Sequence, residues 1–387
     1  MKNNYWIVDE WLIFKPEFNE KLTYYYDVIN KYKKIMFSDY NDPLMAIETN
    51  NQYAVKYYGN YIESEFNQKI NLLNNVNLTH LNFGWCFSKE INLSNNINLT
   101  HLTFGILFNK EIDLLNKINL THLSFGGCFN QKINLSNNIN LTHLTFKRNF
   151  YQKTDLSNNI NLTHLTFEGD FNQEIDLSNN INLTHLTFEW NFNQKIDLSN
   201  NINLTHLTFG WNFNQKIDLL NNINLTHLTF GSNFNQKIDL SNNINLTHLN
   251  FGKEFNKKID LTKYINLTHL TFGWKFDQEI FIPLNIKSLS MFKCSYQYII
   301  DNLHNNIEEI NIYRTDLNLD NLPNSIKKLY IMQYEKELNN LPNSIEYLEL
   351  INYNLKIKKI PKNLKIVKCD KDYKYINDFK NYEVITY

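Results

Sequence analysis

Ten histidines recur along this chain at one fixed interval of 21 residues. Imidazole is a common ligand for Zn²⁺ and Cu²⁺, and it is the side chain that titrates nearest to neutral pH. A metal site needs three or four converging ligands and a second shell, whereas a straight row gives each imidazole two neighbours and no carboxylate. Metal binding by this histidine ladder is therefore an alternative hypothesis. The ladder consists of His80, His101, His122, His143, His164, His185, His206, His227, His248 and His269.

A response of the histidine ladder to pH is the stronger expectation. Two charged imidazoles about 5 Å apart repel each other by about 0.8 kcal/mol in water, and by more where water is scarce. We therefore expect the ten histidines to form a pH-responsive ladder, whose protonation destabilises the fold as the pH falls.

No other residue pattern indicates catalysis. No serine or cysteine nucleophile has an identifiable base and orienting group, and no glycine-rich loop suited to phosphate is present. Repeated aspartates such as Asp176, Asp197 and Asp218 are expected on a solvated face, with Ca²⁺ binding as the alternative. The sequence predicts that the protein is not an enzyme and has no catalytic residues, no bound metal and no cofactor.

Composition and charge narrow the class of partner. The 387 residues carry 38 Lys and Arg against 39 Asp and Glu, which does not fit a nucleic-acid-binding protein. No apolar run approaches the ~18 residues of a membrane span, and Asp9 and Glu10 interrupt the first apolar stretch, unlike a secretory signal. Cys86 and Cys128 lie two coils apart, ~9.6 Å, which is beyond disulfide reach. We expect reduced thiols and an intracellular, cytoplasmic protein that binds neither nucleic acid nor membrane.

The histidine interval is the period of a repeat, and a repeat of this length predicts a solenoid of stacked coils. In the segment 204–209, Leu204, Leu207 and Phe209 hold repeat positions 1, 4 and 6, the spacing of an L-x-x-L-x-L strand. Leu207 and Phe209 should point inward, while His206 and Thr208 point outward. We expect seven buried rows at positions 1, 4, 6, 10, 14, 16 and 20, as in Leu204, Leu207, Phe209, Phe213, Ile217, Leu219 and Ile223, with a short back strand at 217–219.

The predicted fold is mainly β, a leucine-rich-repeat-like solenoid of about fifteen coils with a parallel sheet. Residues 1–62 are expected to form a helical N-terminal cap or adaptor, because apolar residues from Phe18 to Met36 follow helical spacing and Asp42-Pro43 is typical of a helix start. Residues 63–281 hold ten 21-residue repeats, 282–370 hold diverged repeats of 19–21 residues, and 371–387 are expected to form the C-terminal cap.

The repeat resembles the FNIP repeat, a relative of the leucine-rich repeat. The segments 213–217 (FNQKI) and 225–231 (LTHLTFG) carry the resemblance, and 322–329 (LPNSIKKL) is similar to that family's Leu-Pro-x-Ser-Leu-x-x-Leu element. The resemblance implies a protein of amoebae or of the giant viruses that infect them. If the protein is viral, its expected location is the cytoplasm of the host. In this family an F-box, which docks on a ubiquitin-ligase adaptor, often precedes the repeats; the closest match here is Phe14-Lys15-Pro16, which is degenerate.

Variation between repeats indicates where a partner binds. Tryptophan, an interface anchor where exposed, stands at position 8 in the consecutive units of Trp190 and Trp211, which are expected to stack or to cover the sheet edge. The outward positions of the diverged coils are chemically diverse, as a selective surface requires: Glu309, Lys328, Tyr330, Tyr347 and Glu349. The sequence predicts a non-enzymatic scaffold that binds a protein partner of unspecified identity through the sheet and adjacent loops. The alternative within binding is a substrate receptor for a ubiquitin ligase.

Overall fold

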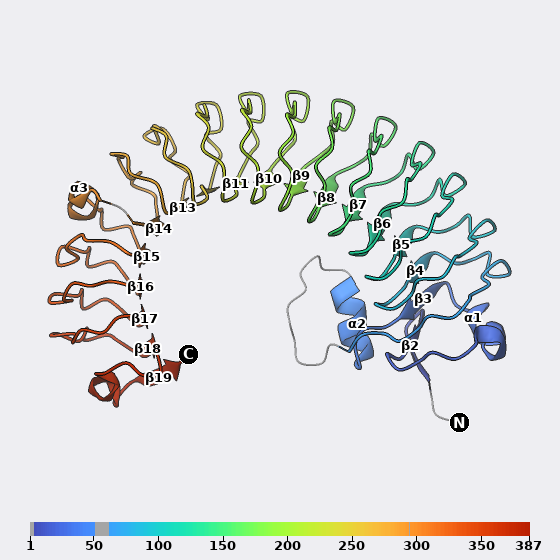
Figure 1. Cartoon of the computed structure of the whole chain (residues 1–387), viewed down its shortest axis with the longest axis horizontal. Coiled ribbons are helices and arrows are strands. Elements are labelled where there is room, and N and C mark those ends of the chain that lie inside the picture. Colours follow the sequence, from blue (N-terminus) through green and yellow to red (C-terminus); the bar gives the residue numbers. More distant parts are fainter. Residues whose placement is uncertain (1–3, 51–61, 294) are drawn as a thin grey trace. The chain divides into compact units, whose positions relative to one another are not determined.

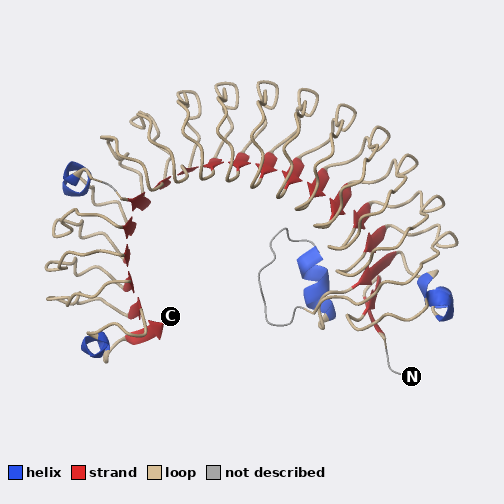
Figure 2. Cartoon of the chain, viewed as in Figure 1, coloured by secondary structure: helices blue, strands red, loops and turns tan. Residues whose placement is uncertain are grey.

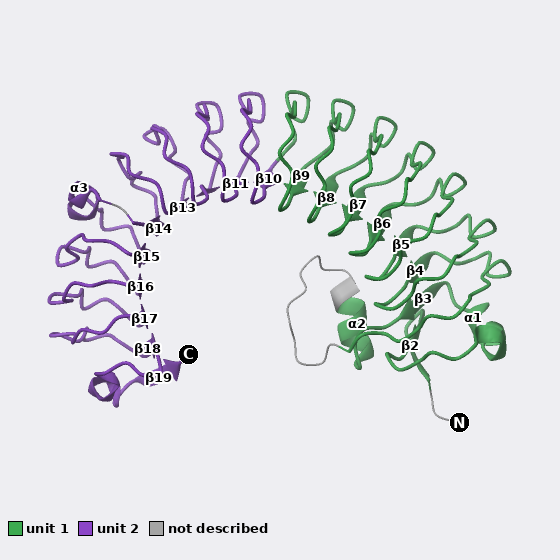
Figure 3. Ribbon diagram, viewed as in Figure 1, with its two compact units in different colours: residues 1–204 green, residues 205–387 purple. Residues whose placement is uncertain are grey.

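The computed structural model describes residues 4–50, 62–293 and 295–387. The chain divides into two compact units, residues 1–204 and 205–387 (Figure 3). In each unit every coil contributes one short strand, and loops and turns make up most of the remainder (Figure 2). The prediction of a mainly β, leucine-rich-repeat-like solenoid is confirmed.

In the first unit the described residues form nine strands (Figure 1). β1 and β2 are antiparallel, and every later neighbour from β2 to β9 pairs in parallel and in chain order. The strands are β1 (Tyr5–Val8), β2 (Trp11–Phe14), β3 (Lys34–Phe37), β4 (His80–Asn82), β5 (His101–Thr103), β6 (His122–Phe125), β7 (His143–Phe146), β8 (His164–Phe167) and β9 (His185–Phe188).

The second unit contains ten strands within the described residues, all paired in parallel. They are β10 (His206–Phe209), β11 (His227–Phe230), β12 (His248–Asn250), β13 (His269–Phe272), β14 (Ser288–Phe292), β15 (Glu309–Tyr313), β16 (Lys328–Met332), β17 (Tyr347–Ile351), β18 (Ile366–Cys369) and β19 (Glu383–Thr386). Helix α3 (Gln297–Asp301) and the 3₁₀ turn η2 (Ile376–Phe379) lie in loops. The predicted count of fifteen coils is slightly low, because β2, β3 and β19 also join the parallel ladders.

The predicted helical cap at the N-terminus is wrong for the residues that the structure describes. The segment 18–36 contains only the 3₁₀ turn η1 (Leu22–Tyr24) and the single turn α1 (Tyr26–Ile29), and Met36 lies in strand β3. Phe18 and Leu22 are buried as coil residues, so their helix-like spacing reflects inward-facing positions of a coil. The predicted helix start at Asp42-Pro43 is correct: α2 (Pro43–Asn50) begins there, and Asp42 Oδ1 accepts the amide N–H of residue 44 at 2.8 Å.

Five of the seven predicted apolar rows form the core. Repeat positions 1, 4, 6, 10 and 16 are buried in the repeated coils, and phenylalanines at positions 6 and 10 stack within each coil. The ring centroids of Phe83 and Phe87 are 3.9 Å apart, and Phe83 lies 5.6 Å from Phe104 of the next coil. Stacking of identical coils therefore gives continuous aromatic columns, and these bury the apolar surface that a single coil would expose.

The predictions for positions 14 and 20 need correction. No strand forms at 217–219, where Ile217 is only half-buried and Asp218 Oδ1 accepts the N–H of Leu220 at 2.9 Å to hold a turn. Position 20 faces outward, and position 19 is buried in its place: Ile244 is 50% exposed while Asn243 is 0% exposed. Asn243 Nδ2 donates to the carbonyls of residues 219 and 222 at 3.0 and 2.9 Å. The amide adds a second hydrogen bond to each of two buried carbonyls that also accept a backbone N–H, and isoleucine has no donor for this role.

Candidate functional site

The histidine ladder is a column of stacked rings on the outward face of the sheet. In the first unit the centroids of His80 and His101 are 4.1 Å apart with planes 10° from parallel, and His101 and His122 repeat this geometry at 4.1 Å and 11°. In the second unit His248 and His269 lie 4.1 Å apart at 9°. Strand pairing in register, His to His, places the rings one above the other.

Threonine at position 2 fixes the tautomer of the histidine that follows it. Thr100 Oγ1 lies 3.0 Å from the carbonyl oxygen of Thr79 and 2.9 Å from Nδ1 of His101. The hydroxyl has one hydrogen, which it donates to the carbonyl, so His101 must donate its Nδ1–H to the hydroxyl. The hydrogen-bond network thus assigns neutral His101 the tautomer in which Nε2 carries the lone pair. Thr121 makes the same two contacts, to residue 100 and to His122.

Burial lowers the pKa of several histidines of the ladder. Desolvation lowers the pKa of His101 to about 4, and positive charge on His80 and His143 contributes a smaller lowering. The pKa of His122 is also lowered to about 4 by burial and then by its ladder neighbours. In the second unit burial lowers the pKa of His248 to about 4.

The ladder geometry does not favour a chelated metal. Rings within about ten degrees of parallel direct their lone pairs side by side, whereas a metal needs ligands that converge on one point. Within residues 4–50, 62–293 and 295–387, no group of three or more His, Cys, Asp or Glu side chains is arranged to hold a metal ion.

At the N-terminal end of the sheet, α2 covers the face that carries the ladder (Figure 1). Trp11 pairs in register with Lys34, which pairs with His80, so Trp11 belongs to the ladder row. Trp11 and Met36 pack with Ala46 of α2 in one apolar cluster, and the Trp11 ring meets His80 edge-on at 5.5 Å. The face of this sheet therefore accepts a packed helix where its outward side chains are apolar.

The five candidate residues in the diverged coils come together on the outward face of β15, β16 and β17. Register pairs Glu309 with Lys328 and Lys328 with Tyr347, and in the next row it pairs Tyr330 with Glu349. Lys328 Nζ is 3.5 Å from a Glu309 carboxylate oxygen, and the rings of Tyr330 and Tyr347 lie 5.3 Å apart. We call the cluster of Glu309, Lys328, Tyr330, Tyr347, Glu349, Lys368 and Tyr387 the tyrosine face.

Lys368 and Tyr387 of the tyrosine face were missed from the sequence. Lys368 Nζ lies 3.7 Å from Glu349 and 4.1 Å from the centre of the Tyr387 ring, and the hydroxyls of Tyr347 and Tyr387 both donate to the Glu349 carboxylate. Burial, followed by the bond to Glu349, raises the pKa of Tyr347. The sequence signal for Lys368 was its outward strand position, but Tyr387 depends on β19 joining the sheet.

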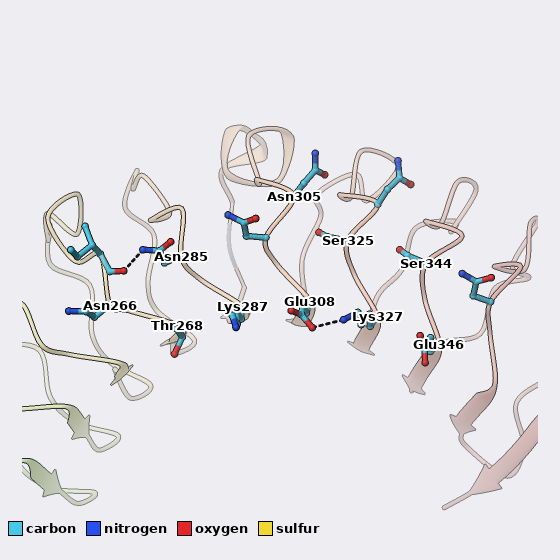
Figure 4. Close-up of a pocket in the computed structure, with 14 residues that line it drawn as sticks. Asn266, Thr268, Asn285, Lys287, Asn305, Glu308, Ser325, Lys327, Ser344 and Glu346 are labelled. Carbon is cyan, nitrogen blue, oxygen red and sulfur yellow. Dashed lines mark hydrogen bonds and ion pairs between the residues drawn. The ribbon is translucent and has the colours of Figure 1, made fainter.

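Beside the tyrosine face, an open groove of about 650 Å³ follows the strand entrances in the second unit (Figure 4). Its floor alternates in charge from coil to coil: Lys287, Glu308, Lys327 and Glu346. Lys327 Nζ lies 2.8 Å from Glu308, and Lys365 Nζ lies 2.7 Å from Glu346. These ion pairs link neighbouring coils. The carboxylates of Glu308 and Glu346 are therefore already paired with lysines of the protein itself.

The two candidate tryptophans belong to different units, Trp190 to the first and Trp211 to the second. Trp190 is 56% exposed and Trp211 is 57% exposed, so each presents a large apolar surface to solvent. The backbone of Trp190 has φ of 36°, a left-handed conformation that a non-glycine residue rarely adopts. The stacking of the two rings stays a prediction.

Comparisons with known proteins support the repeat fold described above. The chain is similar to the solved structure of CroV588, which is described as a novel circular leucine-rich-repeat protein. The two sequences are 30% identical, the match covers 96% of this chain and 71% of CroV588, and the TM-score is 0.54. The functional domain of InlJ from Listeria monocytogenes, which includes a cysteine ladder, is 19% identical, covers 76% of this chain and 69% of its own, and has a TM-score of 0.54. These likenesses define a leucine-rich-repeat-like solenoid.

The sequence model of the FNIP repeat matches residues 313–353, which span β16 and β17 of the tyrosine face. The chain belongs to the leucine-rich-repeat-like proteins and contains a FNIP repeat. No curated protein matches it. Among the residues that the structure describes, no helix is long and apolar enough to cross a membrane.

Proposed function

We propose that this protein is a non-enzymatic scaffold that binds a protein partner through the tyrosine face of its second unit. The supporting observation is that aromatic, acidic and basic side chains from β15 to β19 gather on one sheet face. The corresponding positions of the earlier coils carry uniform His and Thr or Ser/Asn. Tyrosine is enriched among residues that dominate binding energy, because it buries a large rigid surface and keeps a hydrogen-bonding hydroxyl.

The contacts within the tyrosine face favour binding because they hold its side chains in place beforehand. Glu349 is reached by two phenol hydroxyls and one ammonium group, which fixes Tyr347, Tyr387 and Lys368 around it. Side chains that are already ordered lose less conformational entropy on association. Trp190 and Trp211 are proposed as additional anchors, since both are more than half exposed.

The ubiquitin-ligase hypothesis gains no support from the fold. An F-box is a helical segment, whereas the described part of residues 1–62 contributes strands β1, β2 and β3 to the sheet, and its one helix of eight residues, α2, packs on that sheet. We propose that this segment serves the solenoid as its N-terminal cover. We further propose a cytoplasmic location, supported by the free thiols of Cys86, Cys128 and Cys369.

Quantitative binding measurements on the full chain test this function. A partner first identified by cross-linking is titrated against wild type and against Tyr330→Ala and Tyr347→Ala, each expected to weaken binding at least tenfold, about 1.4 kcal/mol. Tyr24→Ala is the matched control, because Tyr24 is 85% exposed in the other unit. Unchanged affinity in both tyrosine variants, or an equal loss in the control, would contradict the proposal.

A further inference from the structure

The outward isoleucines at repeat position 20 form a regular apolar row on one flank of the first unit. We call this row the isoleucine ridge. Its members are between 42% and 52% exposed: Val76, Ile97, Ile118, Ile139, Ile160, Ile181 and Ile202. Each stands one residue after the buried position 19, so the same turn that directs the asparagine inward directs the branched side chain into solvent.

The fold does not require an apolar residue at position 20. The diverged coils of the second unit carry Asn305, Asn324, Asn343 and Lys362 there, and their strands β15 to β18 keep the parallel register. A coil can therefore form with a polar side chain at this position. The ridge leaves apolar surface in water without a structural reason within the coil itself.

Amide hydrogen bonds between successive coils hold the ridge in place. Asparagine at position 21 anchors each coil to the one before it: Asn140 Nδ2 donates to the carbonyl of Ile118 at 2.9 Å, and Asn161 Nδ2 donates to that of Ile139 at 2.9 Å. Asparagine at position 18 does the same, as Asn137 Nδ2 donates to the carbonyl of residue 115 at 3.0 Å. These bonds keep the ridge side chains at a fixed spacing from coil to coil.

We propose that the isoleucine ridge is the interface through which two copies of this chain associate. The ridge places one apolar side chain per coil, at the ~4.8 Å spacing of paired strands. Only a partner surface with the same spacing can contact every one of these side chains in the same way. A second copy has that surface, and a two-fold axis places identical ridges against each other in one closed, self-complementary contact.

The area of the ridge is in the range that such a contact needs. Seven half-exposed branched side chains leave apolar surface on the order of 500 Å², at the upper end of the about 300–600 Å² patch usual on a monomer. A stable interface takes about 800 Å² from each partner, so the ridge would supply the apolar part and the exposed asparagines beside it the polar part. The paired amides would form the polar rim around the apolar row.

Sedimentation velocity of the full chain over a hundredfold concentration range tests the proposal. Wild type is expected to shift from monomer to dimer, and the double variant Ile118→Lys with Ile160→Lys is expected to weaken association at least tenfold while leaving circular dichroism and the thermal midpoint of dilute protein unchanged. The variant Ile118→Asn with Ile160→Asn, which copies the residue of the diverged coils, should behave in the same way.

The matched control is Glu111→Lys with Glu174→Lys at position 13, since Lys132 and Lys153 already occupy that exposed position in other coils. This control should dimerise like wild type. A wild-type chain that stays monomeric at the highest concentration overturns the proposal. So does a dimer that the ridge variants leave intact, or one that the control weakens equally. Partner binding at the tyrosine face is measured separately, so either proposal can fail alone.

Discussion

At the scale of single residues, the buried asparagine of position 19 contributes more to the stability of the fold than the isoleucine next to it. Asn180 Nδ2 donates to the carbonyls of Leu156 and Asn159 at 3.0 and 2.9 Å and is fully buried, whereas Ile181 is half exposed. Hydropathy alone would rank the two residues in the opposite order. The reason is that the asparagine amide makes two buried hydrogen bonds, each of which stabilises the fold, whereas leaving the isoleucine methyl groups exposed costs little.

Substituting the two neighbours separates these contributions. Asn180→Ala is expected to lower the free energy of unfolding by about 2 kcal/mol, because two buried amide hydrogen bonds are lost while each carbonyl keeps its backbone donor. Ile181→Ala should lower it by less than about 1 kcal/mol, as is usual for a surface substitution. Urea denaturation of dilute protein measures both, and a larger loss for Ile181→Ala would contradict the assignment.

Lys117 offers the converse test, because it stands where most of the 21-residue coils have asparagine. Its side chain is fully buried, desolvation lowers its pKa, and its ammonium group donates to the neighbouring Asn116 side chain. Lys117→Asn should restore the two amide bonds of the asparagine column and raise the free energy of unfolding by about 1–2 kcal/mol. Asn116→Lys at the exposed neighbouring position is the control and should not stabilise. A destabilised Lys117→Asn protein would count against the role of the column.

At the scale of the element, the stacked strands β4, β5 and β6 bring the imidazoles of successive coils within about 4.1 Å of each other. The folded pKa of His101 and His122 is about 4, below the about 6.5 of an unfolded chain. Between these values the unfolded state binds more protons than the folded state, so stability is complete above about pH 6.5 and is lost as the pH falls toward 4. Partial exposure of the rings to solvent moderates the effect.

The thermal midpoint is therefore expected to fall by several degrees between pH 7.5 and pH 4.5. The double variant His101→Gln with His122→Gln should show a shallower fall, because two groups that bind protons only when unfolded are removed. Comparing these two chains isolates the histidines from carboxylates, whose titration is common to both. Equal slopes in the two proteins would rule out the ladder as the source of the pH dependence.

At the scale of the whole molecule, a solenoid is stable only if its terminal coils are covered. We propose that residues 371–387 provide this cover in the second unit, because β19 pairs with β18 and Tyr373 and Phe379 are buried. We expect a chain ending at residue 370 to expose the last coil and the edge of β18 and to aggregate. Light scattering of the truncated protein checks this, with Lys380→Ala, an exposed change within the cap, as control. A monodisperse truncated chain would show that this segment is dispensable.

Much of this architecture follows from the amino-acid sequence alone. The period, the strand at positions 3 to 6, the five apolar rows and the side of the strand that faces outward were all predictable, because strand alternation is a local property and the repeat copies it coil after coil. The same reasoning placed Glu309, Lys328, Tyr330, Tyr347 and Glu349 on one face, which the structure confirms.

Only the tertiary structure decided which side of each corner is buried. Asn243 rather than Ile244 turns inward because carbonyls of the preceding coil lie there, and no single-coil pattern reveals them. Likewise, Phe18 and Leu22 have spacing that suits a helix, yet they are buried in a coil because β2 and β3 extend the sheet. Tyr387 reaches Glu349 only because β19 joins β18. Contacts between coils fix these features, and such contacts exist only once the coils have stacked.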